Sequence, residues 1–152
     1  MKTFEVELAL SNFFYKKGAE AVISKTNFLG YEADILATTK NWYLTEVEIK
    51  ISKSDFMADF KKYHKHDSKL TKYLYYAVPT TLLKLADEML DKNVGIMEVF
   101  KPKYLKRGLR VKIIRDAKIR SNRPLNESQV INLYRLGCYK EWGFKAKQLK
   151  EV

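Results

Sequence analysis

The chain has 152 residues, of which 46% are hydrophobic and 31% charged, and its net charge is +11. This composition indicates a single globular domain over residues 1–152 and excludes a disordered chain. No apolar run approaches the roughly 18–20 residues that span a bilayer, so we expect no membrane partner.

The first third of the chain predicts a helix followed by three strands. An apolar stripe on residues 3–17 predicts an amphipathic helix, which Gly18 ends. Residues 19–28, 31–37 and 42–52 predict strands, because the last two alternate and are rich in β-branched and aromatic side chains. The four-residue connection between those two strands favours a hairpin.

The rest of the chain alternates helices and strands. These elements, in chain order, are a helix over 55–66 capped by Ser54 or Asp55, a strand over 72–79, a helix over 80–91, strands over 94–100 and 109–118, and a long last helix. Helices between successive strands in this half, with hairpins in the first, predict an α/β fold with a mixed sheet.

The last helix is marked by its first turn. Asn126 and Gln129 stand in the positions of a capping box, which predicts a helix beginning there. The single cysteine, Cys138, falls in this helix, and we expect it to be a small buried packing residue rather than a catalytic thiol. One cysteine cannot form an internal disulfide and suits a reducing, cytoplasmic location.

The positive charge is concentrated at one end of the chain. Residues 1–100 hold 14 basic and 14 acidic side chains, whereas residues 101–152 hold 15 and 4. The basic C-terminal third therefore carries the whole excess of +11, which indicates a polyanionic partner such as DNA. The alternative is a solvated basic surface with no partner.

An unusual set of charges lies within the predicted hairpin. Alternation along the strand 42–52 places Glu46, Glu48 and Lys50 on one face, and Asp34 on the neighbouring strand can lie beside Glu48. Converging carboxylates repel one another unless a cation joins them, and a hard divalent ion is the natural occupant. The alternative is an exposed sheet face with cross-strand ion pairs.

The wider pattern resembles a known superfamily. The stretches "ADILA", "EVEIKISKSDFMADFKKY", "KYLYYAVP" and "VGIMEV" are similar to the PD-(D/E)XK nucleases, and within them to the MmcB-like DNA-repair nucleases. The resemblance implies a restriction-endonuclease-like core of order αβββαβ, here with extra C-terminal strands and a C-terminal helix. It also implies dependence on Mg²⁺ or Mn²⁺.

The resemblance implies roles for individual residues. Asp34 and Glu48 become metal ligands with the backbone carbonyl of Ile49, and Lys50 becomes the catalytic lysine. Many members add a glutamate from the first helix, and the sequence leaves open whether Glu5 or Glu7 serves. Whether Glu46 is a second-metal ligand or a charge at the strand end also stays open; we favour the second.

Basic side chains around this centre are candidates for contact with DNA. They are Lys53, Lys61, Lys62, Lys65, Lys103, Lys106, Arg107 and Arg110. The two histidines, His64 and His66, lack ligand partners at a useful spacing in the sequence, which argues against zinc.

The sequence therefore predicts a metal-dependent DNA endonuclease of repair or processing, structure-directed or nonspecific. The alternative is a DNA-binding protein of the same fold without catalysis, and a basic protein–protein adaptor is a third hypothesis. A homodimer would suit paired cuts. On this hypothesis Lys50→Ala abolishes cleavage and leaves thermal stability nearly intact.

Overall fold

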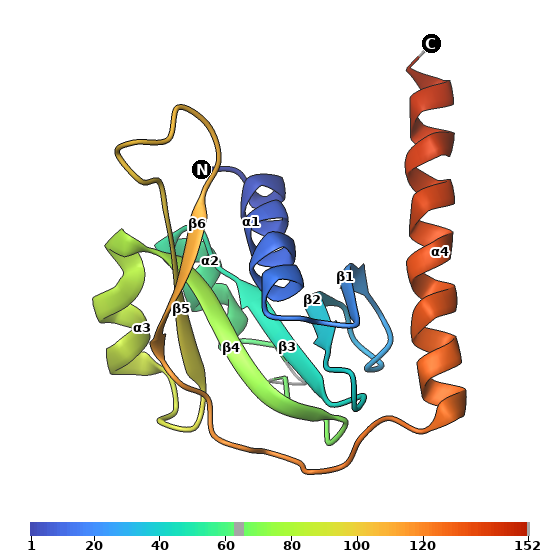
Figure 1. The fold of residues 1–152 in the computed structure, drawn as a ribbon. Coiled ribbons are helices and arrows are strands. Elements are labelled where there is room, and N and C mark those ends of the chain that lie inside the picture. The colour runs from blue at the N-terminus through green and yellow to red at the C-terminus, as the bar shows by residue number, and fades with distance from the viewer. Residues whose placement is uncertain (63–65, 152) are drawn as a thin grey trace.

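The computed structural model describes residues 1–62 and 66–151 (Figure 1). Its elements follow the predicted order of helices and strands. They are α1 (Thr3–Lys16), β1 (Ala21–Thr26), β2 (Ala33–Thr38), β3 (Leu44–Ile49), α2 (Lys53–Asp59), β4 (Thr71–Pro79), the 3-10 turn η1 (Thr80–Leu82), α3 (Leu83–Met89), β5 (Gly95–Phe100), β6 (Arg110–Arg115) and α4 (Glu127–Lys150).

The strands form one open six-stranded sheet in the order β1-β2-β3-β4-β5-β6. β1, β2 and β3 are antiparallel neighbours, β3, β4 and β5 run parallel, and β6 returns antiparallel to β5. The parallel strands are joined by crossovers that contain α2 and α3, as parallel pairing requires. The expected mixed α/β sheet is confirmed.

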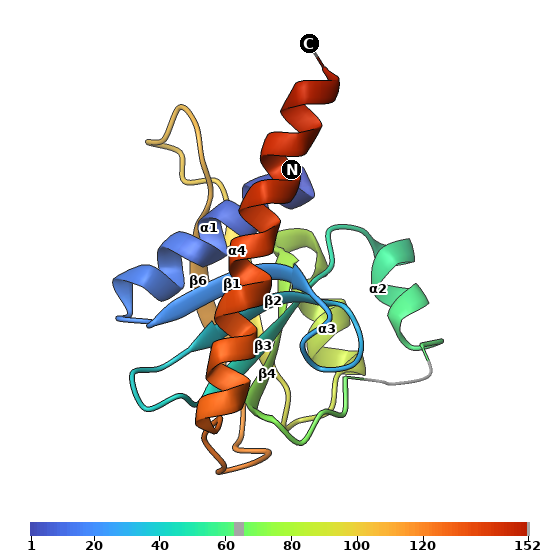
Figure 2. The same ribbon diagram turned by 90° about the vertical axis from the view of Figure 1, so that its right-hand side faces the viewer.

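The two faces of the sheet are covered by different helices (Figure 2). On one face, Val6 and Leu10 of α1 pack against Val47 and Ile49 of β3. On the other face, Phe56 of α2 joins apolar side chains of β4, α3 and β5, which are Leu74, Tyr76, Val78, Ala86 and Ile96. Residues of β3 that point away from α1 therefore lie in the layer between the sheet and α2.

α4 packs on the outer strand β1 with only part of its length. Its capping box is present, with Asn126 and Gln129 side chains each bonded to the other's backbone N–H. Leu133 packs with Ile23 of β1, while the second half of the helix extends beyond the sheet (Figure 1). Cys138 is exposed, so the expected buried packing role is wrong. In the part of the chain that the structure describes, no helix is long and apolar enough to cross a membrane.

α2 differs from its predicted helix at both ends. Its N-cap is Ser52, whose Oγ accepts a hydrogen bond from the N–H of Asp55 at 3.2 Å, instead of Ser54 or Asp55. The helix ends at Asp59, seven residues before the predicted end at His66. Asp59 and His66 make a buried contact with each other. A helix that continued to His66 would hold these two residues about two turns apart and break that contact.

Candidate metal-binding and catalytic site

The acidic face of β3 is buried. Glu46, Glu48 and Lys50 are at most 3% exposed and point into the layer under α2, while Val47 and Ile49 pack under α1. The alternation predicted from the sequence is thus confirmed, but the alternative of an exposed sheet face is wrong. Burial makes each of these charges depend on partners within the protein.

Asp34 on β2 lies beside Glu48. The antiparallel register pairs Ile35 with Val47 and Leu36 with Glu46, and continuing it places Asp34 opposite Glu48. The backbone N–H of Ile49 donates a hydrogen bond to Asp34 Oδ2 at 2.8 Å. Asp34 is half-buried, which makes it the more solvent-accessible of the two carboxylates.

Lys50 is held between two carboxylates. Its Nζ lies 3.3 Å from Glu48 Oε2 and 3.1 Å from Asp59 Oδ1 at the end of α2. Burial alone disfavours the ammonium, but the charges of Glu48 and Asp59 hold the pKa of Lys50 above its ordinary value. The side chain therefore stays protonated at neutral pH and is fixed in place.

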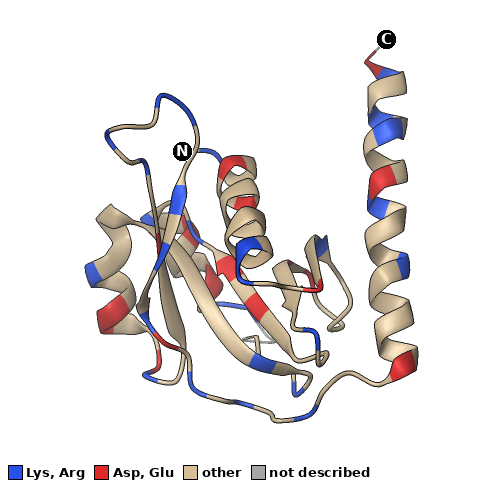
Figure 3. Cartoon of the chain, viewed as in Figure 1, with Lys and Arg blue, Asp and Glu red and all other residues tan. Residues whose placement is uncertain are grey.

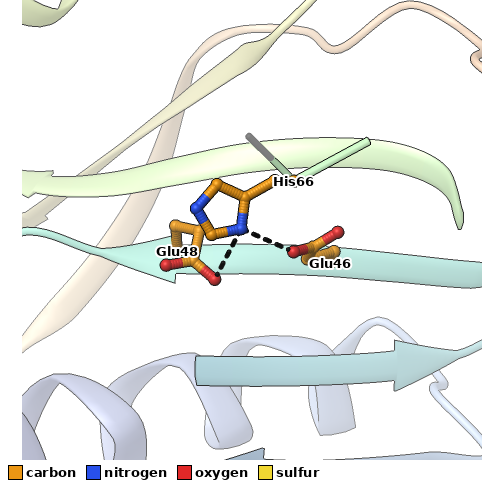
Figure 4. Close-up of side chains that lie close together, drawn as sticks. All are labelled: Glu46, Glu48 and His66. Atoms are coloured by element: carbon orange, nitrogen blue, oxygen red, sulfur yellow. Dashed lines mark hydrogen bonds and ion pairs between the residues drawn. The ribbon is translucent and has the colours of Figure 1, made fainter. Parts of the chain in front are cut away.

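His66 contacts three carboxylates, and Figure 4 shows its contacts with two of them, Glu46 and Glu48. Its Nδ1 lies 3.0 Å from Glu46 Oε1 and 3.2 Å from Glu48 Oε1, and its Nε2 lies 3.0 Å from Asp59 Oδ1. Burial disfavours the imidazolium, yet hydrogen bonds to Asp59 and Glu46 raise the pKa of His66 to about 9. His66 is accordingly a cation in the metal-free protein at neutral pH.

Asp59 anchors the cluster from the α2 side. Besides its contacts with Lys50 and His66, it accepts a hydrogen bond from Tyr76 Oη of β4 and forms an ion pair with Lys62 at 3.0 Å. Burial opposes its charge, but the bonds from His66, Tyr76 and Lys62 hold the pKa of the Asp59 carboxyl well below its usual range. It is a permanent anion at physiological pH.

Glu48 is the least satisfied member of the cluster. Its Oε1 is buried and accepts no hydrogen bond from any residue in the described ranges 1–62 and 66–151. Burial, together with the nearby charge of Asp34, raises the pKa of Glu48 to about 8. Its Oε1 contacts His66 Nδ1 at 3.2 Å as an ion pair without hydrogen-bond geometry, which leaves an acceptor position for a further positive group.

Three of these side chains converge closely enough to share a metal ion. One ligand atom each from Glu46, Glu48 and His66 can be chosen so that all lie within 4.8 Å of one another. A second possible set is Asp34, Glu48 and the backbone of Ile49, which the Asp34–Ile49 hydrogen bond brings together. Glu48 belongs to both sets.

The structure places the glutamates of α1 elsewhere. Glu5 closes the N-terminus of α1, where its Oε2 accepts a hydrogen bond from the N–H of Lys2 at 2.6 Å. Glu7 lies 3.2 Å from Lys25 Nζ of β1. Because α1 covers the face of the sheet opposite Glu48, neither glutamate is brought together with the acidic side chains of β3.

The candidate DNA-contact residues that the structure describes are exposed and fall in two groups, within the lysines and arginines that Figure 3 colours blue. Lys53 begins α2 and Lys61 and Lys62 follow its end, whereas Lys103, Lys106, Arg107 and Arg110 lie on the β5–β6 loop and the start of β6. Lys62 is already paired with Asp59. Lys65 lies outside the described residues. Both groups follow the carboxyl ends of parallel strands, β3 and β5, and hence the same edge of the sheet.

Sequence reasoning missed the partners that complete the cluster. Asp59, His66, Tyr76 and Tyr31, whose Oη donates to Glu46 Oε2 at 2.8 Å, were not among the predicted site residues. The argument that the histidines lack partners is wrong for His66, because Glu46 and Glu48 come from a strand 18 to 20 residues earlier. His64 lies outside the described residues. Tyr76 is the neighbour of Glu48 in the β3–β4 register, so pairing the two predicted strands would have indicated it as a site residue.

Comparison with known proteins gives information about the fold. No family model matches the chain, and no curated protein matches it in sequence. Its structure is similar to that of the SPO1766 protein of unknown function from Silicibacter pomeroyi, with a TM-score of 0.63 and 16% identity. The match covers 93% of this chain and 86% of that chain. At this identity the similarity shows a shared α/β fold and assigns no activity.

Proposed function

We propose that the chain is a metal-dependent DNA endonuclease of the PD-(D/E)XK superfamily, resembling the MmcB-like DNA-repair nucleases. The observation that carries the proposal is the meeting of Asp34, Glu48 and Lys50 at the end of the β2–β3 hairpin. Two acids and a lysine, with the spacing D-x13-E-x-K, are the residues that the superfamily uses to hydrolyse phosphodiesters.

The arrangement of elements supports the proposal. A helix, a three-stranded antiparallel unit, a helix and a parallel strand follow one another in the order αβββαβ. The restriction-endonuclease-like core has this order, and the acids lie on its second and third strands. A shared fold alone does not imply shared chemistry, so the function rests on the side chains.

The residues present fit a hard divalent cation. Asp34 and Glu48 supply carboxylate oxygens, and Glu48 Oε1 is a buried acceptor with no hydrogen bond from the described residues. The N–H of Ile49 points to Asp34, and the carbonyl of a strand residue faces the same side as its N–H. Mg²⁺ or Mn²⁺, when bound there, polarises the phosphoryl oxygen and acidifies a water molecule.

Lys50 supplies a fixed positive charge at this centre. Because Glu48 and Asp59 hold its ammonium in place, it needs little reorganisation when negative charge develops on the phosphorus oxygens. It also donates a hydrogen bond that orients the attacking water. Asp34 is the half-buried member of the set, and we infer that the scissile phosphate approaches from its side.

DNA is the substrate that the charge distribution favours. The exposed lysines at α2 follow the end of β3, and those of the β5–β6 loop follow the end of the parallel strand β5, so both groups belong to the same edge of the sheet. Phosphate contacts of this kind bind DNA without reading its sequence. The proposal is therefore structure-directed or nonspecific cleavage. The second candidate, a DNA-binding protein without catalysis, is favoured by the deep burial of Glu48 and Lys50.

A cleavage assay separates the two candidates. Purified protein is incubated with branched, single-stranded and duplex DNA, with Mg²⁺, with Mn²⁺ or with a chelator. We expect metal-dependent cleavage that Asp34→Asn abolishes, because the amide still accepts the Ile49 bond but lacks the ligand charge. Glu88→Gln, on the exposed face of α3, is the matched control and should cleave normally.

Three results would decide against the nuclease. These are DNA binding without cleavage of any substrate, cleavage that survives chelation, and equal cleavage by Asp34→Asn. The first would establish the non-catalytic alternative.

A further inference from the structure

The geometry points to a second cation site, formed by Glu46, Glu48 and His66, that binds a transition-metal ion of the zinc class. It goes beyond the proposed nuclease centre, because neither Asp34 nor the Ile49 carbonyl takes part in it. Zinc binding is measurable without DNA, so this inference stands or fails independently of any cleavage.

The ligand atoms are already spaced for coordination. His66 Nδ1 lies 3.0 Å from Glu46 Oε1 and 3.2 Å from Glu48 Oε1. Two ligands that each lie about 2.1 Å from a tetrahedral zinc ion are roughly 3.4 Å apart. Figure 4 shows His66 Nδ1 between oxygens of the two glutamates, and the three atoms lie within 4.8 Å of one another, so small movements of the side chains would let them share an ion.

Outer partners orient two of the three ligands. His66 Nε2 bonds to Asp59, which turns Nδ1 toward the glutamates, and Tyr31 Oη bonds to Glu46 Oε2, which turns Oε1 toward His66. A carboxylate behind a histidine is the usual support of a metal-ligating imidazole. Asp59 is itself fixed by Tyr76 and Lys62, so the support is rigid.

The third ligand, Glu48, is 1% exposed, and its Oε1 accepts no hydrogen bond from the described residues. Its contact there is the ion pair with His66 Nδ1 at 3.2 Å, which a metal ion between the two atoms would replace. Four carboxylates, those of Asp34, Glu46, Glu48 and Asp59, share this region with three cations, Lys50, Lys62 and His66. A zinc ion bound by these ligands displaces the proton from His66 Nδ1 and takes its place between the carboxylates.

The backbone of His66 agrees with a functional position. Its φ is +52°, a left-handed conformation that is uncommon for residues other than glycine. Strained conformations of this kind persist where surrounding contacts determine them, and they cluster at functional sites. Here the three carboxylates hold the ring in place.

The ligand set selects the class of metal. One imidazole nitrogen with two carboxylates suits Zn²⁺, whereas Mg²⁺ prefers oxygen ligands in an octahedron and Ca²⁺ takes six to eight oxygens. We therefore expect zinc to bind more tightly than manganese, and magnesium to be unable to displace it.

Calorimetric titration of the metal-free full chain with ZnCl₂ tests the site. We expect one tight equivalent in the wild type and a loss of affinity of at least about tenfold in His66→Gln and in Glu46→Gln. Asp34→Asn, which removes a neighbouring carboxylate outside the ligand set, should keep most of the affinity. Glu88→Gln is the surface control and should not differ from the wild type. Circular dichroism verifies that each variant is folded.

Co²⁺ supplies a test that needs no variant. It substitutes for zinc and is paramagnetic, so the ring protons of His66 should shift strongly in the NMR spectrum on addition of one equivalent. Unshifted His66 protons, no tight zinc binding by the wild type, or wild-type affinity in both ligand variants would each overturn the inference. If the protein does not cleave DNA, the zinc-binding measurements are unaffected, so the two proposals can fail separately.

Discussion

Lys50 Nζ lies 3.1 Å from Asp59 Oδ1, and this buried pair joins the end of β3 to the end of α2. Both side chains are only 3% exposed. The lysine that we propose as catalytic is therefore also a connection between the sheet and a covering helix. Its removal has a structural consequence that the sequence did not indicate.

Lys50→Ala should destabilise the metal-free protein by about 3 kcal/mol. Removing one partner of a buried ion pair leaves the other charge uncompensated, at a cost of about 3–5 kcal/mol. The lower end applies because Lys62 and His66 still contact Asp59 when Lys50 is removed. Urea denaturation at pH 7 measures the change. The sequence-based expectation of nearly unchanged stability does not account for this burial.

Lys53→Ala is the matched control for that measurement. Lys53 is exposed at the start of α2, and surface substitutions of this kind change stability by less than about 0.5 kcal/mol. Equal stability of Lys50→Ala and Lys53→Ala would show that the Lys50 pair contributes nothing.

The metal-free protein should lose stability as the pH rises from about 6.5 to 9. The pKa of His66 rises on folding from 6.5 to about 9, so its contribution is complete below pH 6.5 and is lost as pH passes 9. The pKa of Glu48 also rises on folding, from 4.5 to about 8. Because the folded protein binds this proton more tightly than the unfolded chain, its stability falls as the pH rises and the proton is lost. Urea denaturation across this range, with a chelator present, measures the loss.

The variant His66→Gln tests the contribution of the histidine to this pH dependence. His66→Gln lacks the titrating ring, so its stability should depend less on pH between 6.5 and 9. Wild-type stability that is flat or rising over this range would contradict the assigned charge of His66.

Neutralising the β5–β6 loop should weaken DNA binding for all sequences alike. Lys103, Lys106 and Arg107 are exposed there, and the slope of log affinity against log salt falls by about 0.9 for each phosphate that the protein no longer neutralises. The triple change to glutamine is compared with Lys145, Lys147 and Lys150 changed to glutamine at the end of α4. Equal slopes in the two triple variants would mean that net charge matters and the loop does not.

Ser52→Ala should cost about 1 kcal/mol of stability, since Ser52 Oγ caps α2 by accepting from Asp55 N–H at 3.2 Å. Ser54→Ala removes a hydroxyl two residues later that bonds to Ser52 and does not cap the helix. Thermal unfolding of both variants measures the difference. A larger loss for Ser54→Ala would place the cap where the sequence analysis put it.

Local patterns predicted most of the fold. The helical stripe ending at Gly18, the alternation of 42–52 and the capping box at Asn126 each act over a few residues, and each element appears where expected. The end of α2 and the exposure of Cys138 were missed. Both depend on contacts between segments far apart in the chain, which short-range periodicity does not record.

The candidate site was predictable only in its strand half. Period-two alternation places Glu46, Glu48 and Lys50 on one face, and hairpin pairing adds Asp34. Asp59 and His66 join them only because α2 ends early and the chain returns over the sheet. A histidine 20 residues from its carboxylate partner has no spacing signature, so the second half of the cluster required the structure.

The two outer strands of the sheet have different protection against unwanted pairing. β1 packs against α4, whereas β6 carries the exposed side chains of Arg110 and Lys112. Positive side chains on an edge strand repel the edge of another copy and so oppose intermolecular strand addition. The exposed basic side chains of β6 should therefore oppose aggregation of the concentrated protein through this edge.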